Sequence, residues 1–152
     1  MFCFVADYGA TVIQLGDVAA ADIPDLPELL DQLGYPSDAD AIAARVQRIG
    51  DAGGRVLVAR EDDEVLGVMA LEFLALLHHD DDLCRITALV VADRARGRGV
   101  GRRLVAEAER IARAHRCGRI EVTSAEHRAA AHAFYLALGY HEQRKRFLKH
   151  LE

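Results

Sequence analysis

The sequence has few cysteines, and none of them has a paired spacing. Cys3, Cys84 and Cys117 are far apart and odd in number. A disulfide framework needs an even set of cysteines, and a zinc cluster needs ligands such as closely spaced CxxC pairs. We therefore expect reduced, buried thiols and no metal site.

Long hydrophobic segments are also missing. No apolar run approaches the roughly 20 residues that a membrane-spanning helix needs. The first residues, MFCFVADYGA, lack the basic start and the longer apolar core of a signal peptide. We therefore expect a cytoplasmic protein with no membrane partner.

Internal repeats, linkers and low-complexity segments are absent as well. The 152 residues suit one domain that is large enough to bury a core. Hydrophobic residues make up 51% of the chain and charged residues 28%, which is ordinary for a globular protein. We expect a single domain over residues 1–152, in which residues 1–10 are an N-terminal extension.

The positive charge is concentrated in one short segment. The formal net charge is −5, yet residues 92–103 carry five arginines against Asp93 alone. An acidic protein with one basic loop is suited to holding a small anion rather than to coating nucleic acid. We therefore expect no nucleic-acid partner.

Hydrophobic periodicity predicts an alternation of strands and helices. Helices are expected at 21–35, 37–50, 100–115 and 128–138, with Gly118 ending the third. Strands are expected at 11–16, 55–61, 65–77, 83–91 and 119–124, and a final strand or hairpin at 140–151. An early hairpin followed by strand–helix alternation predicts a mixed α/β sheet covered by helices.

The segment RARGRGVGRRLV, residues 94–105, follows a predicted strand and opens a predicted helix. The first N–H groups of a helix have no internal acceptor, and the helix dipole places partial positive charge there. Glycines let the backbone approach a phosphate closely, and arginines add charge-assisted hydrogen bonds. The pattern predicts an anion site.

Two familiar phosphate loops do not fit this segment. A GxxxxGK[ST] loop needs a lysine, which the region lacks, and a GxGxxG loop starting at Gly97 would need glycine where Arg102 stands. A loop of capping glycines and solvated arginines that binds nothing remains an alternative.

Two further motifs accompany the loop. Residues 96–101 read R-x-x-G-x-G at a strand–helix junction, and residues 124–140, SAEHRAAAHAFYLALGY, end in F-Y-x-x-x-G-Y. With LLDQLGYP at 29–36, these segments resemble the GNAT (Gcn5-related) N-acetyltransferase superfamily over about residues 11–150. The resemblance implies the GNAT acyl-CoA N-acyltransferase fold, a central mixed and mostly antiparallel sheet flanked by about four helices.

The resemblance also implies acetyl-CoA as the donor. In that family the loop N–H groups hold the pyrophosphate of coenzyme A, and the preceding strand pairs with the pantetheine arm. The implied cofactor-binding residues are Leu89, Val91, Arg96, Gly97, Arg98, Gly99, Val100, Gly101, Arg102, Arg103 and Arg128. Many relatives carry asparagine at position 128, so Arg128 either reaches the cofactor phosphates or is solvated.

Acetyl transfer from a thioester to a primary amine makes three demands. The amine must lose a proton, the oxyanion needs a hydrogen-bond donor, and the departing thiolate benefits from a proton. The resemblance implies the Val91 backbone N–H, at a bulge in strand 83–91, as the oxyanion donor, and Tyr135 as the general acid. The alternative for Tyr135 is simple packing against Phe134.

The general base stays open. Some relatives place a glutamate on the strand before the loop, but here that neighbourhood reads Arg85-Ile86-Thr87. The substitutes are Glu72, His78, His79 and Glu121, or a water relay; histidine has the most suitable ordinary pKa. The predicted catalytic residues are therefore Tyr135, Val91 and Glu72. The sequence does not favour Glu72 over the other candidate bases.

We expect direct transfer of the acetyl group to a primary amine of a small molecule in a ternary complex, because no cysteine lies in either motif to form an acyl-enzyme. Two alternatives are an acetyltransferase acting on a protein amine and a non-catalytic acyl-CoA-binding or regulatory module. The run HHDDD at 78–82, expected near the acceptor cleft, either attracts a cationic amine or only solubilises a loop. Assembly as a homodimer also stays open.

Overall fold

The structure is a computed structural model that describes residues 12–123, 129–143 and 146–151. The chain divides into two compact units, Met1–Val122 and Thr123–Glu152, and each is described here by itself. The predicted extension at 1–10 and Arg128 lie outside the described residues. No described helix is long and apolar enough to cross a membrane.

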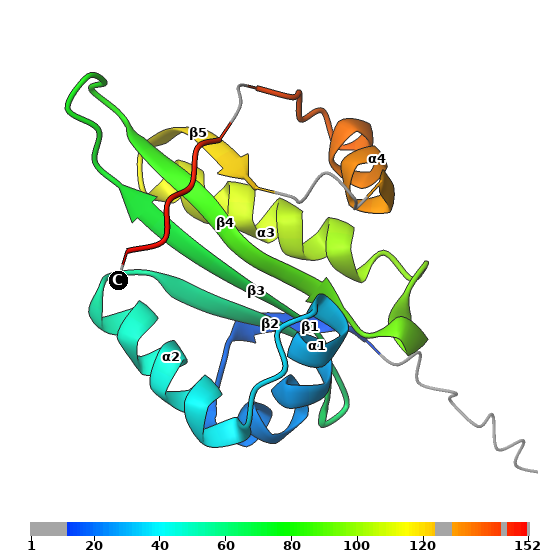
Figure 1. The fold of residues 1–152 in the computed structure, drawn as a ribbon. Coiled ribbons are helices and arrows are strands. Elements are labelled where there is room, and N and C mark those ends of the chain that lie inside the picture. The colour runs from blue at the N-terminus through cyan, green and yellow to red at the C-terminus, as the bar shows by residue number, and fades with distance from the viewer. Residues whose placement is uncertain (1–11, 124–128, 144–145, 152) are drawn as a thin grey trace, which may run out of the picture. The chain divides into compact units, whose positions relative to one another are not determined.

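A five-stranded sheet forms the centre of the first unit (Figure 1). The strands lie in the order in which they occur in the chain: β1 (Gln14–Asp17), β2 (Arg55–Glu61), β3 (Glu64–Leu74), β4 (Asp82–Val91) and β5 (Cys117–Val122). Neighbours are antiparallel except for β5, which runs parallel to β4. The predicted mixed, mostly antiparallel sheet is confirmed.

Helices cover both faces of this sheet (Figure 1). They are α1 (Leu26–Leu33), α2 (Ala39–Asp51) and α3 (Val100–Ala114), with short 3-10 turns at η1 (Ala20–Asp25) and η2 (Asp93–Ala95). α3 lies on one face, and α1 and α2 lie on the other. α3, the longest described helix, therefore packs against the two strands that it connects, β4 and β5.

The apolar face of α3 is fully buried, as its periodicity predicts. Six residues of that face are at most 4% exposed: Val100, Leu104, Val105, Ala108, Ile111 and Ala112. Gly67 of β3 lets the helix come close, because a Cβ there would lie 3.1 Å from both the Leu104 and the Val100 side chains. Odd-numbered residues of β3 near Gly67 therefore face α3, and even-numbered residues face away.

Two helix ends in the first unit have residues that suit a cap. Gly34 ends α1 in the left-handed conformation with φ of 94°, which glycine adopts without strain. The Asp38 carboxylate caps α2 by accepting the Ala41 N–H at 2.8 Å. The tight turn at Asp62–Asp63 is also present, with Glu61 opposite Glu64 across the hairpin.

Gly118 does not end the third helix, contrary to the prediction. α3 already ends at Ala114, and Arg116 makes the turn with a positive φ of 61°. Gly118 lies instead in β5, where a Cβ would overlap the Asp81 side chain. The Asp81 side chain thus lies against Gly118, in the space that a Cβ would take.

The predicted final strand at 140–151 is wrong for the described residues of that stretch, 140–143 and 146–151, which form no strand. Phe147 and Leu148 are adjacent, so the segment lacks the alternation of a strand that buries one face. Both side chains are exposed, at 93% and 71%.

The second unit contains α4 (Ala129–Ala137) within the predicted 128–138. Gly139 follows it with a positive φ of 88°. The rings of Phe134 and Tyr135 meet edge to face at 5.1 Å between centroids, and the Tyr135 and Tyr140 rings lie at 5.5 Å. The F-Y-x-x-x-G-Y motif therefore forms a local aromatic cluster.

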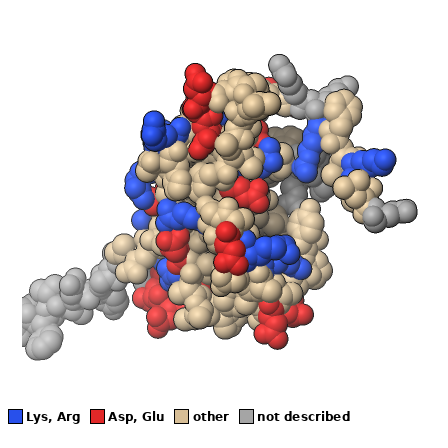
Figure 2. All heavy atoms as spheres, turned by 90° about the vertical axis from the view of Figure 1, so that its left-hand side faces the viewer, with Lys and Arg blue, Asp and Glu red and all other residues tan. Residues whose placement is uncertain are grey.

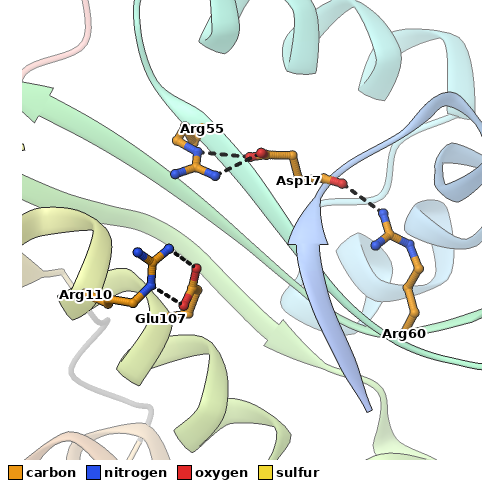
Figure 3. Close-up of polar contacts among 5 residues, drawn as sticks. All are labelled: Asp17, Arg55, Arg60, Glu107 and Arg110. Carbon is orange, nitrogen blue, oxygen red and sulfur yellow. Dashed lines mark hydrogen bonds and ion pairs between the residues drawn. The ribbon is translucent and has the colours of Figure 1, made fainter. Parts of the chain in front are cut away.

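Ion pairs secure the edge strand β1 and the segment after it. Arg55 holds the Asp17 carboxylate with two bonds of 2.9 Å, and Arg60 donates to the Asp17 carbonyl at 2.8 Å (Figure 3). Arg60 also makes a bidentate pair with Asp22, whose buried carboxyl has its pKa lowered chiefly by that hydrogen bond. Figure 2 shows acidic and basic side chains lying next to one another on one face of the molecule.

Candidate functional site

β4 and β5 part before β4 ends. Their parallel pairing runs from Asp82 opposite Cys117 to Ile86 opposite Val122 and stops there, while β4 continues to Val91. Within the described residues no other strand pairs with β4 on that side. The backbone of β4 between Ile86 and the glycine loop is therefore open along one edge.

Two residues of this open stretch turn their backbone polar groups toward the β5 side. Ala92 donates its N–H to the Leu66 carbonyl at 2.8 Å. This bond shows which residues at the end of β4 direct their backbone groups toward β3: Ala92 does, and so does every second residue before it in this stretch. Because successive residues of an antiparallel pair point their backbone groups to opposite sides, those of Leu89 and Val91 point away from β3. Such groups need partners in a folded protein or its complexes.

The bulge in β4 lies at Thr87, not at Val91 as predicted. Ala88 pairs with Ala70 and Ile86 pairs with Leu71, so Thr87 is the extra residue. The Thr87 side chain is exposed and its hydroxyl contacts the Ala70 carbonyl at 3.4 Å. The bulge thus occurs where β5 ends, and its effect is to bend β4 at the point where the two strands part.

The glycine loop that follows β4 is shaped for close backbone approach. Gly97 and Gly99 have positive φ values of 76° and 77°, and a Cβ at either would meet no atom within 4 Å. Arg103 makes the first bond into α3, donating its N–H to the Gly99 carbonyl at 3.0 Å. The N–H groups before it have no acceptor inside the helix, and the space in front of the loop is open.

Three of the five loop arginines are engaged with carboxylates. Arg94 pairs with Glu64 at 2.7 Å and more loosely with Glu28, and Arg96 pairs with Asp93 at 2.7 Å. Arg98 makes a bidentate pair with Glu61. Arg96 and Arg98, both among the predicted cofactor-binding residues, thus have carboxylate partners within the protein, and their contact with coenzyme A stays a prediction.

Arg102 and Arg103 differ from the other loop arginines. Both are exposed in the first turn of α3, and neither has an ion-pair partner among the described residues. Their charge adds to the positive end of the helix dipole. They are the loop cations that are available to an anionic ligand.

α1 holds the base of the loop. The Gln32 side-chain oxygen accepts the Asp93 N–H at 3.1 Å, and Arg94 reaches Glu28 at 3.5 Å. The segment at 29–36, which carries part of the family resemblance, therefore anchors the start of the glycine loop through Gln32.

A row of three charged residues crosses the sheet where β4 and β5 part. Glu72 of β3 lies opposite Arg85 of β4, which lies opposite Glu121 of β5. By the alternation described above, the row is on the face away from α3. Arg85 donates to Glu121 at 2.5 Å, whereas Glu72 is half-buried with no ion pair among the described residues.

The acidic run at 78–82 lies at the opposite end of β4 from the glycine loop, about 30 Å away for a strand of this length. Asp81 pairs with Arg119 at 3.6 Å and rests on Gly118. With His79 and His115 the aspartates line an open hollow of about 690 Å³. The run lies just before the Asp82 end of β4, and the open stretch begins after Ile86 of the same strand; that the run attracts a cationic amine stays a prediction.

Tyr135 of α4 is half-buried. Burial raises the pKa of its hydroxyl to about 12. The two cysteines among the described residues show no activation: burial raises the pKa of Cys84 to about 11 and that of Cys117 in the same direction. Neither thiol is suited to nucleophilic attack at neutral pH.

Sequence reasoning missed the carboxylates that hold the loop. Glu61 and Glu64 flank the Asp62–Asp63 turn and looked like ordinary turn charges. One signal in the sequence could have revealed them. Two glutamates at paired positions of a hairpin repel each other unless a positive charge neutralises them.

The comparisons agree with this geometry. The acetyltransferase (GNAT) family model matches residues 20–140. The chain is 33% identical over 123 residues to the aminoalkylphosphonate N-acetyltransferase of Salmonella typhimurium, which covers 81% of this chain and 78% of that protein. The chain belongs to the acetyltransferase (GNAT) family. The predicted family membership is confirmed.

Solved structures show that this acetyltransferase shares the family fold. A Trypanosoma brucei acetyltransferase superimposes with a TM-score of 0.79 at 21% identity, covering 92% of this chain and 100% of the other. The glucosamine-6-phosphate N-acetyltransferase of Arabidopsis thaliana gives 0.74 at 17% identity, with coverage of 93% and 99%. At these identities the likeness concerns the fold alone.

Acetyltransferases of this family take the acetyl group from acetyl-CoA. The first unit has features that fit such a donor: open space before Gly97 and Gly99, the positive end of α3, and two arginines, Arg102 and Arg103, with no ion-pair partner in the described part of the chain. The open backbone of Leu89 and Val91 suits the amide groups of an extended arm. The described residues also contain no group of three or more metal-binding side chains.

Substituting alanine for Gly99 should destabilise this acetyltransferase by about 1–2 kcal/mol, because an L-residue is strained at φ of 77° although no atom blocks its Cβ. Gly50→Ala is the matched control, since Gly50 lies inside α2 with equal space; it should be neutral or stabilising by up to about 1 kcal/mol. Urea unfolding measures both. Equal effects of the same sign would contradict the strained loop.

Proposed function

We propose that this acetyltransferase moves the acetyl group of acetyl-CoA directly onto a primary amine of a small molecule, within a ternary complex. The observation that carries the proposal is the open edge of β4, which leads from the fork at Ile86 into the glycine loop. One ligand with amide groups at one end and phosphates at the other matches both parts. The inert environment of Cys84 and Cys117 supports direct transfer over an acyl-enzyme.

The loop and the strand divide the work of binding the donor. The N–H groups of Gly97, Gly99 and Val100 hold the pyrophosphate, with Arg102 and Arg103 supplying charge. The backbone of Leu89 and Val91 pairs with the pantetheine arm, as a peptide adds to a sheet edge. The Val91 carbonyl takes part in this pairing, and its N–H donates instead to the thioester carbonyl oxygen as negative charge develops on that oxygen.

Proton transfers are assigned to Glu72 and Tyr135. Glu72 accepts the proton of the attacking amine, since it has no ion pair among the described residues, whereas Arg85 already neutralises Glu121. Tyr135 donates a proton to the departing thiolate, and burial keeps its hydroxyl protonated at neutral pH.

The acceptor class is inferred from a relative. The Salmonella typhimurium protein is named for aminoalkylphosphonates, which are small molecules that carry an amine. Two functions compete with this one: acetylation of a protein amine, and binding of acyl-CoA without catalysis. A single assay separates all three.

An amine panel tests the function. With acetyl-CoA, the protein should release free thiol in the presence of at least one small amine, drawn from an aminoalkylphosphonate, an aminoglycoside, a hexosamine phosphate and a polyamine. A lysine-containing peptide should give no release above the background. Release with the peptide alone would favour a protein acceptor, and coenzyme A binding without any release would favour a binding module.

Tyr135→Phe should lower kcat by about 10²–10⁴-fold, the range expected for a lost general acid. A pKa of about 12 means that the wild-type hydroxyl loses its proton only as pH rises through that value. The rate should therefore show no fall from Tyr135 ionisation between pH 7 and 10. Tyr140→Phe, in the same ring cluster, is the control and should lose less than tenfold; equal losses would assign Tyr135 to packing.

Glu72→Gln should lower kcat/KM by about 10²–10⁴-fold, because the amide cannot take the amine proton. Glu121→Gln removes the carboxylate at the other end of the same row and should cost less than tenfold. Steady-state kinetics at saturating acetyl-CoA decides between them. A larger loss for Glu121→Gln would move the general base to β5.

A further inference from the structure

The tip of the β2–β3 hairpin holds the glycine loop through two ion pairs. Glu61 ends β2 and Glu64 begins β3, and the two residues lie opposite each other. Glu61 binds Arg98 in a bidentate pair, and Glu64 binds Arg94 at 2.7 Å. Arg94 also donates to the Val65 carbonyl at 3.2 Å. The hairpin tip and the loop are thus joined at both ends of the segment 94–98.

The carboxylates of Glu61 and Glu64 would repel each other if nothing neutralised them, because like charges directly opposite in a hairpin are destabilising. Each is matched by one arginine of the loop. The Arg98 hydrogen bond lowers the pKa of Glu61, and Glu61 raises the pKa of Arg98. A lowered pKa means that the pair is formed at neutral pH and is lost only when pH falls through that value.

Arg98 stands between the two glycines with positive φ. These glycines have no side chains that could fix the loop, and nothing lies within 4 Å of where a Cβ would be. Among the described residues, the Arg98–Glu61 pair is the side-chain contact that ties this glycine-rich stretch to the rest of the first unit. Glu61 is well placed to hold it, since its side chain is only 19% exposed.

We propose that Glu61 is a positioning residue for the donor loop and that Arg98 is its counterpart, held by Glu61 and not in contact with phosphate. Arg102 and Arg103, which have no ion-pair partner among the described residues, supply the side-chain charge toward the phosphates. The inference rests on the proposed function, in which this loop holds coenzyme A. It adds that the acidic hairpin tip sets the conformation in which the loop N–H groups converge.

Charge reversal distinguishes a positioning pair from a phosphate contact. Coenzyme A binding is measured by calorimetry for the wild type, Glu61→Gln, Arg98→Glu and the double variant that exchanges the two residues. Glu61→Gln should weaken binding about fivefold, as expected for a lost surface pair of good geometry, and Arg98→Glu should weaken it more. The exchanged pair should recover affinity to within about twofold of the wild type.

Opposite results would overturn the proposal. If Arg98 contacts phosphate, Glu61→Gln should tighten binding by releasing the guanidinium, and the exchanged pair should stay as weak as Arg98→Glu. Glu107→Gln is the matched control, because Glu107 and Arg110 form a similar bidentate pair on α3 (Figure 3), with bonds of 2.9 and 2.7 Å. It should leave affinity unchanged.

Hydrogen exchange of the free protein keeps this test separate from the proposed function. Amides of residues 97–103 should exchange faster in Glu61→Gln than in the wild type, and the exchanged pair should restore the slower rate. If wild-type protein does not bind coenzyme A, the proposed function fails while this readout still tests the pair. Unchanged exchange in Glu61→Gln would contradict the positioning role itself.

Discussion

The structure depends on one constraint: backbone N–H and C=O groups in a protein interior need partners, and β4 leaves some of its own without a strand beside them. β5 pairs with β4 only as far as Ile86 and Val122. Beyond that point the groups of Leu89 and Val91 point to the open side, and the chain then runs into a loop whose N–H groups are equally free. In the function that we propose, coenzyme A completes this edge, because acetyltransferases of this family take the acetyl group from acetyl-CoA.

Charge in the loop serves two purposes. Arg94 and Arg98 neutralise a pair of glutamates at a hairpin tip, so their contribution is to hold the loop in place. Arg102 and Arg103 lie one turn further on, at the positive end of α3. The loop backbone can bind an anion through its N–H groups alone, provided that these groups converge on one point. Fixing so glycine-rich a segment in that arrangement costs conformational entropy. The paired arginines reduce that cost before any ligand arrives.

Much of this arrangement could be predicted from the sequence, because it depends on local patterns. The apolar period of residues 100–112 predicted the buried face of α3, and the R-x-x-G-x-G segment predicted the strand–loop–helix order. The bulge was placed at Val91 although it lies at Thr87, since register depends on pairing with β3 and not on the residues of β4 alone. Gly118 was misread because its neighbour Asp81 is distant in sequence. The ion pairs of Glu61 and Glu64 were missed for the same reason.

The central claim is that the open edge of β4 and the glycine loop together form the donor site. The most direct measurement is the change in backbone amide NMR shifts on adding coenzyme A. The account predicts the largest changes at Leu89, Val91 and residues 97–103, with little change in the hollow around Asp81 and His115. Changes concentrated at that hollow, or at the loop without any at Leu89 and Val91, would contradict it.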